Sequence, residues 1–516
     1  MPSTRLAPAP RVKQNLTVRW GTTTSPDSLR GLAIVAALFT VLQLAIVLPG
    51  SPLGWDETVY FSQVSPDRPA AFFSAPRARG ISYLVAPVAA LTTSTEALRV
   101  YLALLSGGAL FLAFAAWRRL LPPALLTGAA ALFASLWITQ YYGPQAMPNV
   151  WVAFAALAGT GCFLRVVRPV PDQWGVRIPT GPGAHAGLAA AVAFAALMRP
   201  ADAAWLVLPL AVAALAVRQW RRPVVLALLV GGLVIGSLPW IAEAYLHYGG
   251  LSARLHRASE IQGGMGLHMA VDDQVRSLQG RSLCRPCNIP WRHPLTGVWW
   301  FVLPLLAVGG TVAAVRARRT AVLLLPLLVG LALSIPYLFL IDYAAPRFLL
   351  PTYALFSLPV AYCCARMVAG VRPGWRPVTG GLLAAALALH VAAQYGVLQD
   401  VAARARAAGE GQDRVTAALK RAGFRPPCTI SGEHAVQVAW GLGCASRQVS
   451  GHDESITPAG LLAAADARPT AFLVAASRPV PDYVRQWRTV RLPNVWGLRD
   501  YRAYVSPSAR PADTAP

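Results

Sequence analysis

The stretch Gly54-Trp55-Asp56-Glu57-Thr58-Val59-Tyr60 follows the first long apolar run of the chain, which covers residues 31–49. That run is long enough to cross a bilayer once. Basic residues precede it at positions 11, 13, 19 and 30, and the next basic residue after it is Arg68. Because Lys and Arg gather on the cytoplasmic side of a span, we expect the N-terminus in the cytoplasm and Asp56 and Glu57 at the outer face.

Two adjacent carboxylates at that depth are costly to hold beside an apolar surface without partners, so the pair favours a functional interpretation. A solvated loop that carries two acids is the alternative, and the spacing alone leaves both open. A hydroxyl nucleophile needs a base within hydrogen-bond reach, and a carboxylate near a low-dielectric surface has its pKa raised toward a useful value. If the pair is functional, one of these acids could therefore accept a proton at the outer membrane boundary.

The composition is that of a membrane protein. Of the 516 residues, 55% are hydrophobic and 13% are charged, which is about half the charged share of soluble domains. The net charge of +24 would fit a nucleic-acid partner. The basic residues, however, stand in short strings in alternate loops between apolar runs, as the positive-inside rule requires. We therefore predict a polytopic α-helical membrane protein with no nucleic-acid partner.

The apolar runs predict about eleven transmembrane helices in a domain over residues 31–399, after a cytoplasmic arm over 1–30. Long outer loops over 50–95 and 241–293 interrupt this domain, and residues 81–91 are typical of an interfacial helix. An odd number of spans places the C-terminus outside. The predicted spans lie near 31–49, 96–116, 124–139, 150–164, 184–198, 203–217, 224–240, 295–315, 321–340, 348–367 and 378–397.

Residues 400–505 differ in composition and alternate helical patterns with short apolar strands, which predicts a small extracytoplasmic α/β domain. The last residues, 506–516, are rich in Pro, Ala and Ser, and we expect a disordered tail. The predicted helices cover 413–423, 433–440 and 458–465, and the predicted strands cover 428–432, 470–476, 488–492 and 501–505.

The seven cysteines fall into two groups. Those at positions 162, 363 and 364 lie in apolar runs and are expected as small core residues. Cys284, Cys287, Cys428 and Cys444 fall on the predicted outer side, where disulfides persist. We expect disulfides there, with their partners open. A zinc site from Cys284, Cys287 and His293 is the alternative, although no fourth ligand is evident.

The order of these features resembles the GT-C superfamily of membrane glycosyltransferases, especially the protein O-mannosyltransferases and the aminoarabinose transferases that modify lipid A. Trp55-Asp56-Glu57 carries most of the resemblance, together with Glu96-Ala-Leu-Arg99 at the start of the second predicted span. The resemblance covers about residues 30–400. Three more stretches agree in this order: Pro144 to Asn149, Met198-Arg199-Pro200 and Pro346-Arg347-Phe-Leu-Leu-Pro351.

The resemblance implies a polyprenyl monophosphate sugar as donor, transfer on the extracytoplasmic face of the plasma membrane, and inversion at the anomeric carbon. Asp56 would be the general base, and Glu57 would bind the acceptor or orient the site. The sugar would be a hexose or a pentose, and the acceptor a protein, a lipid or a polysaccharide. No cofactor is implied beyond the lipid-linked donor. Relatives often carry an acid where this chain has Asn149, which weakens the case for a divalent metal without deciding it.

The leaving phosphate needs cationic stabilisation. Arg347 is the first candidate, because it lies at an outer span end between two prolines, and Arg77, Arg79 and Arg199 follow. The alternatives are an interfacial arginine that snorkels to the interface for Arg347 and exposed loop charges for Arg77 and Arg79. Tyr60 lies one helical turn from Asp56, where it would pack beside the carboxylate.

Two other functions compete with transfer. A transporter or flippase of a lipid-linked substrate would place ionisable groups near mid-span, whereas here they concentrate at span ends. A membrane scaffold whose terminal domain binds cell-wall material would leave the pair of acids unexplained. The sequence therefore favours a membrane glycosyltransferase that uses a lipid-phosphate sugar.

Overall fold

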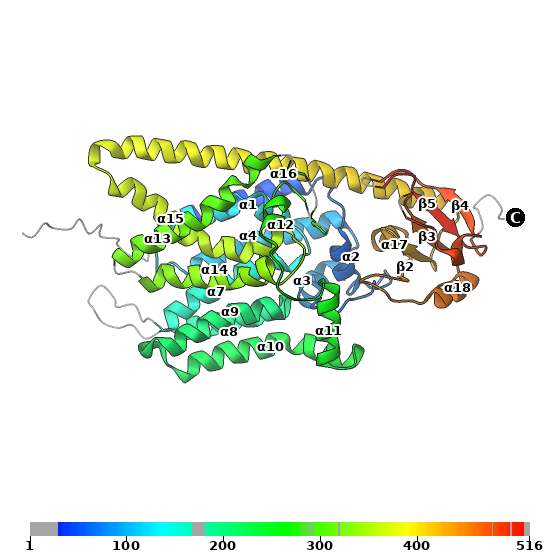
Figure 1. The fold of residues 1–516 in the computed structure, drawn as a ribbon, viewed down its shortest axis with the longest axis horizontal. Coiled ribbons are helices and arrows are strands. Elements are labelled where there is room, and N and C mark those ends of the chain that lie inside the picture. Colours follow the sequence, from blue (N-terminus) through cyan, green and yellow to red (C-terminus); the bar gives the residue numbers. More distant parts are fainter. Residues whose placement is uncertain are drawn as a thin grey trace, which may run out of the picture.

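The computed structural model describes residues 29–509 except 168–180, 282, 286, 288–289, 292, 318–319, 477 and 496–497. The predicted cytoplasmic arm up to residue 28 and the predicted tail from residue 510 lie outside the described residues. Helices dominate the described part, and a small sheet lies at one end of the helix bundle (Figure 1). The predicted architecture, an α-helical membrane domain followed by an α/β domain, is confirmed.

Eight helices in the described residues are long and apolar enough to cross a membrane. Shorter apolar helices lie over three further predicted spans, so each of the eleven has a helix, while the number that cross stays a prediction. The long ones are α1 (Arg30–Leu42, continued to Val47), α4 (Thr95–Ala115), α7 (Pro148–Val167), α10 (Pro223–His247), α13 (Val298–Arg316), α14 (Thr320–Phe339), α15 (Leu350–Gly370) and α16 (Arg376–Arg421), and the short ones are α5 (Pro123–Ala134), α8 (Pro182–Met198) and α9 (Pro200–Ala216).

Prolines begin many of these helices, because a proline in the first turn has no N–H to leave unpaired and its fixed φ suits the helix. α8 ends at Met198 and α9 begins at Pro200, so only Arg199, in extended backbone, separates them. Glycines let helices approach closely: a Cβ on Gly310 of α13 would lie 1.9 Å from the carbonyl oxygen of Pro359 in α15. α7 lies at the centre of the bundle and is almost wholly buried.

Short helices cover the end of the bundle that faces the sheet (Figure 1). One of them, α3 (Gly80–Ala89), covers most of the predicted helix over 81–91, and its place in the membrane interface stays a prediction. Besides α5, α8 and α9, the short α-helices described in the membrane domain are α2 (Trp55–Ser62), α3 (Gly80–Ala89), α6 (Trp137–Tyr142), α11 (Leu251–Ile261) and α12 (Val271–Ser277).

The C-terminal domain continues directly from the bundle, because α16 passes without a break through the predicted boundary at residue 400 (Figure 1). Its five-stranded sheet has the order β2-β1-β3-β5-β4; β1 is parallel to β2 and β3, and β5 is antiparallel to β3 and β4. Ser506 and Ala509, in the predicted tail, are buried in this domain. The strands of the sheet are β1 (Thr429–Gly432), β2 (Ala445–Ser446), β3 (Thr470–Val474), β4 (Arg488–Arg491) and β5 (Arg502–Val505), and the α-helices of this domain after α16 are α17 (Ala435–Leu442) and α18 (Pro458–Ala467).

The domain docks on the first loop of the membrane domain. The Trp440 ring of α17 packs against Phe61 of α2, with the ring centroids 5.3 Å apart, and the Arg68 guanidinium lies 5.6 Å from the Trp440 ring centroid. On α16, a Cβ at Gly409 would lie 3.1 Å from the carbonyl oxygen of Gly50. The fold therefore brings residues 50–68 and the C-terminal domain together.

The four cysteines that the sequence places on the outer side form two disulfides, Cys284–Cys287 and Cys428–Cys444. The prediction of disulfides is confirmed, and the zinc alternative is wrong because Cys284 and Cys287 bind each other. Among the described residues, no group of three or more His, Cys, Asp or Glu side chains could hold a metal ion.

We expect the double variant Cys428→Ser/Cys444→Ser to lose about 3 kcal/mol of stability in the C-terminal domain, because a disulfide restricts the unfolded chain. The bridge spans 16 residues and joins the start of β1 to β2. Thermal unfolding of the purified protein in detergent measures the loss. Cys363→Ser/Cys364→Ser, which removes two free thiols, is the control. An unchanged transition in the first variant would contradict the prediction.

Candidate active site

Glu57 is the fixed acid of the pair. It is 3% exposed, and it caps its own helix, because the Gly54 amide donates to Glu57 Oε2 at 2.9 Å. Arg99 of α4 donates to both carboxylate oxygens, at 2.8 Å to Oε2. The Ala146 amide donates to Oε1 at 2.8 Å. Both oxygens are occupied by partners within the protein, so the geometry favours an orienting role over contact with a substrate.

Arg99 in turn joins the segments around α2. It is fully buried and donates to the carbonyl oxygens of Pro52, at 2.6 Å, and Pro144, at 3.0 Å. The pair therefore ties the start of α2, the start of α4 and the prolyl hairpin before α7 into one unit. A buried ion pair of this kind is costly to break, because the remaining charge is left without a partner.

Asp56 is the open acid of the pair. Its side chain is 37% exposed, whereas Arg77 and Arg347, which bind it, are 11% and 10% exposed. Arg77 Nη2 donates to Asp56 Oδ1 at 2.7 Å, and Arg347 Nη2 lies 3.5 Å from Asp56 Oδ2. A carboxylate held from two sides and still accessible can meet a hydroxyl that approaches from solvent or lipid.

The charges around Asp56 decide its protonation. Burial raises the pKa of the Asp56 carboxyl, but the positive charges of Arg77 and Arg347 outweigh burial, with a smaller contribution from Arg199. The pKa therefore lies below its ordinary value, opposite to the rise that the sequence leads us to expect. The reason is that two guanidinium groups from distant parts of the chain converge on this carboxylate. Asp56 is consequently ionised at neutral pH.

Arg347 lies in the short helical turn Pro346–Leu349, where its guanidinium carbon is 5.4 Å from the Phe348 ring centroid and 5.6 Å from that of Tyr142. Arg199, between α8 and α9, pairs with Asp202 at 3.2 Å and lies 5.8 Å from the same Phe348 ring. Arg77, Arg199 and Arg347 thus converge on Asp56, where a phosphate would find charge-assisted donors.

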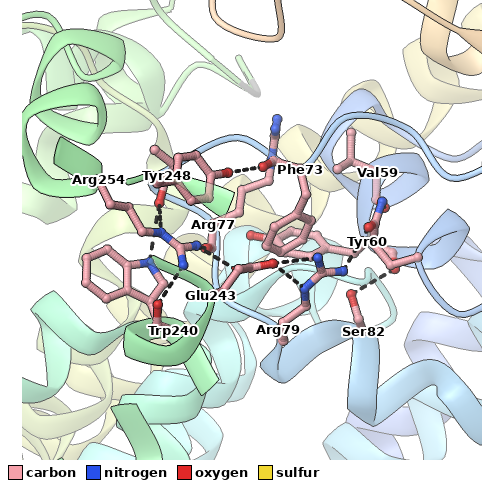
Figure 2. A network of polar contacts seen from close by, with 12 residues as sticks. Val59, Tyr60, Phe73, Arg77, Arg79, Ser82, Trp240, Glu243, Tyr248 and Arg254 are labelled. Carbon is pink, nitrogen blue, oxygen red and sulfur yellow. Dashed lines mark hydrogen bonds and ion pairs between the residues drawn. The ribbon is translucent and has the colours of Figure 1, made fainter. Parts of the chain in front are cut away.

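Arg79 is placed elsewhere. It donates to Glu243 at the end of α10, at 2.9 and 2.5 Å, and to Gln63 at 2.8 Å, with its guanidinium 4.0 Å from the Phe73 ring centroid (Figure 2). Arg254 of α11 binds the other oxygen of Glu243 at 2.8 Å. Of the four arginines predicted to bind phosphate, Arg79 is the one that contacts Glu243 and Gln63 and not Asp56.

Arg254 is a site residue that the sequence does not reveal, because a single arginine in a mixed-charge loop carries no signal of burial. It is fully buried and donates to the backbone carbonyls of Ala75, at 3.1 Å, and Arg77, at 2.9 Å (Figure 2). Trp240 and Tyr248 flank its guanidinium, with ring centroids 4.4 and 4.6 Å away. Arg254 therefore fixes the backbone that carries Arg77.

Tyr60 lies near the Asp56 carboxylate. It is one turn along α2 from Asp56, as predicted, and packs edge to face against Phe73 with the ring centroids 5.9 Å apart. Burial raises the pKa of Tyr60 to about 12. The phenol is therefore neutral at physiological pH and cannot serve there as a base.

Asn149, at the start of α7, is 1% exposed, and neither polar atom of its side-chain amide has a hydrogen-bond partner among the described residues.

Asp453, like Arg254, is a residue that the sequence does not single out. It comes from the C-terminal domain, and its carboxylate accepts from Trp55 Nε1 at 2.5 Å and from Arg77 Nη1 at 2.8 Å.

We expect Arg99→Met to lower the free energy of unfolding by about 3 kcal/mol or more, because it leaves the Glu57 carboxylate buried without its cation. Thermal or denaturant unfolding in detergent measures this. The double variant Arg99→Met/Glu57→Gln should recover part of the loss, and Arg118→Met, at an exposed position beyond the same helix, should change stability by less than about 0.5 kcal/mol. Equal losses in the single and double variants would contradict the pairing.

No family model and no curated protein sequence matches the chain. Solved structures do. The structure of ArnT from Cupriavidus metallidurans bound to undecaprenyl phosphate matches with a TM-score of 0.64 and 13% identity, over 93% of this chain and 99% of that chain. The apo form of ArnT gives a TM-score of 0.62.

A second match is the archaeal oligosaccharyltransferase AglB from Archaeoglobus fulgidus, in complex with an inhibitory peptide and a dolichol-phosphate. Its TM-score is 0.50 and its identity 14%, over 82% of this chain and 64% of that chain. The likeness to ArnT extends over nearly the whole of both proteins. The chain is therefore a multi-pass membrane protein with the GT-C-like fold that its sequence predicts.

Proposed function

We propose that this protein is a glycosyltransferase that moves a sugar from a polyprenyl monophosphate to a hydroxyl group of an acceptor at the extracytoplasmic membrane surface. The observation that carries the proposal is Asp56, an accessible ionised carboxylate that lies between Arg77 and Arg347. The fold supports it, because the ArnT structure has undecaprenyl phosphate bound and the AglB structure is a complex with an inhibitory peptide and a dolichol-phosphate.

The reaction is a single displacement. The acceptor hydroxyl gives its proton to the Asp56 carboxylate while its oxygen attacks the anomeric carbon of the donor. The bond between that carbon and the phosphate oxygen breaks, and the polyprenyl phosphate leaves with the electron pair. One displacement inverts the anomeric carbon. Because phosphate is already a good leaving group, no second carboxylic acid is needed, unlike in glycoside hydrolysis.

The arginines have two effects in this scheme. Arg347, Arg199 and Arg77 stabilise the negative charge that grows on the departing phosphate. They also lower the pKa of Asp56. A phosphate that binds to the same guanidinium groups brings negative charge close to Asp56, which raises its pKa. Donor binding therefore makes Asp56 a stronger base at the moment when a base is required.

We expect Asp56→Asn to lower the transfer rate by at least about 100-fold, because the amide cannot accept the proton. The assay incubates purified protein with a radiolabelled undecaprenyl-phosphate sugar, a hexose or a pentose, and measures acceptor-dependent release of the label. Asp67→Asn, an exposed position in the same loop, is the matched control and should keep full activity. Wild-type activity in Asp56→Asn, at normal membrane levels, would refute the assignment.

We expect Arg347→Ala to lower kcat/KM for the donor by about 100-fold, because the leaving phosphate loses a positioned cation. The same assay with the donor varied at a saturating acceptor concentration measures this. Arg414→Ala, on the exposed surface of α16, should leave kcat/KM unchanged. A donor KM and kcat that stay at wild-type values in Arg347→Ala would remove this residue from the site.

A further inference from the structure

The loop between β2 and α18 is the part of the C-terminal domain that reaches the site around Asp56. It leaves the sheet after Ser446 and returns at Pro458, the first residue of α18. Hydrogen bonds close its neck: the amides of Ser455 and Ile456 donate to the carbonyl oxygen of Gln448, at 2.9 and 3.2 Å, and the Gln448 amide donates to Ser455 Oγ at 3.1 Å. Asp453 lies near the tip of this closed loop.

Asp453 is buried although its neighbours are not. It is 8% exposed, whereas His452 and Glu454 on either side are exposed. Each of its carboxylate oxygens has a different partner: Oδ2 accepts from Trp55 Nε1 and Oδ1 from Arg77 Nη1, at 2.5 and 2.8 Å. Trp55 and Arg77 both belong to the first loop, almost 400 residues earlier in the chain.

Each terminal nitrogen of the Arg77 guanidinium donates to a different carboxylate. Nη1 binds Asp453 and Nη2 binds Asp56, and Ser74 Oγ accepts a further hydrogen bond from Nη1 at 2.5 Å. Because a guanidinium is planar and rigid, fixing Nη1 fixes the direction in which Nη2 meets Asp56. Trp55 precedes Asp56 directly on α2, so the other hydrogen bond of Asp453 holds the same carboxylate through the backbone.

We propose that Asp453 is a positioning residue of the catalytic centre, and that the C-terminal domain completes the active site by aligning Arg77 with Asp56 through it. This inference rests on the proposed function, because it concerns the same base. A positioning residue acts through another group and does not touch the substrate. A misplacement of about 1 Å in a reacting group can cost about 100-fold in rate, so the alignment has a measurable consequence.

The charge of Asp453 adds a second effect. The charged groups that face Asp56 are Arg77, Arg347 and Arg199, and the phenols of Tyr60, Tyr142 and Tyr343 also lie near it. Asp453 neutralises part of the charge of Arg77. Without that carboxylate, the positive potential at Asp56 increases and the pKa of Asp56 falls further. Asp56 would then be a weaker base, and the acid limb of the pH–rate profile would move to lower pH.

The test compares Asp453→Asn with Glu454→Gln, which removes the same charge from the exposed neighbouring position. The measurements are kcat and donor KM with a radiolabelled undecaprenyl-phosphate sugar, the pH profile of kcat/KM, and direct binding of undecaprenyl phosphate. We expect Asp453→Asn to lower kcat by about tenfold, to leave KM and undecaprenyl phosphate binding unchanged or tighter, and to shift the acid limb to lower pH. Glu454→Gln should match the wild type in all four.

Four outcomes are decisive. The expected split between kcat and KM, together with the shifted acid limb, supports the inference. A loss of kcat and of undecaprenyl phosphate binding together, with an unshifted acid limb, would mean that Asp453 only docks the domain and would overturn it, as would full activity in Asp453→Asn. A wild-type protein that neither transfers sugar nor binds undecaprenyl phosphate would overturn the proposed function itself.

Discussion

The buried ion pair between Glu57 and Arg99 is the interaction on which the site depends. Neither side chain has significant contact with solvent, so each charge is stable only because the other is present. The pair gathers the start of α2, the start of α4 and the hairpin before α7 around one point. Since Asp56 directly precedes Glu57 on α2, the position of its carboxylate follows from the position of Glu57.

Two adjacent acids have different roles because of helix geometry. Consecutive residues of an α-helix point about 100° apart, so when Glu57 faces the protein interior, Asp56 faces the open side. There it meets arginines from three separate segments, the first loop, the turn between α8 and α9, and the turn before α15. A second layer, Glu243 with Arg254, holds the backbone of the first of these segments. The helices therefore fix the position of Asp56, and the loops and turns provide the arginines around it.

The sequence predicts what local pattern determines and misses what distant contacts determine. The long apolar helices, the helix α3 within the first loop, and most strands of the C-terminal domain follow from periodicity in short windows. The sign of the pKa shift at Asp56 does not, because it depends on arginines 21 and 291 residues away. The same holds for Asp453, which meets Arg77 across 376 residues. The chemical type of a residue can be read from the sequence, but its partner in a folded membrane protein cannot.

Charge balance links the parts of the site. Arg77, Arg199 and Arg347 face three carboxylates, those of Asp56, Asp202 and Asp453, each within 3.5 Å of an arginine. An anionic donor that enters this set competes with carboxylates for the guanidinium groups. Asp56 has the most accessible carboxylate of these pairs, and its contact with Arg347 is the longest, so this contact is the least costly to exchange. A phosphate that displaces Asp56 from Arg347 leaves that carboxylate ionised, accessible and less strongly held by positive charge, which is the state in which the proposed reaction requires it to accept a proton.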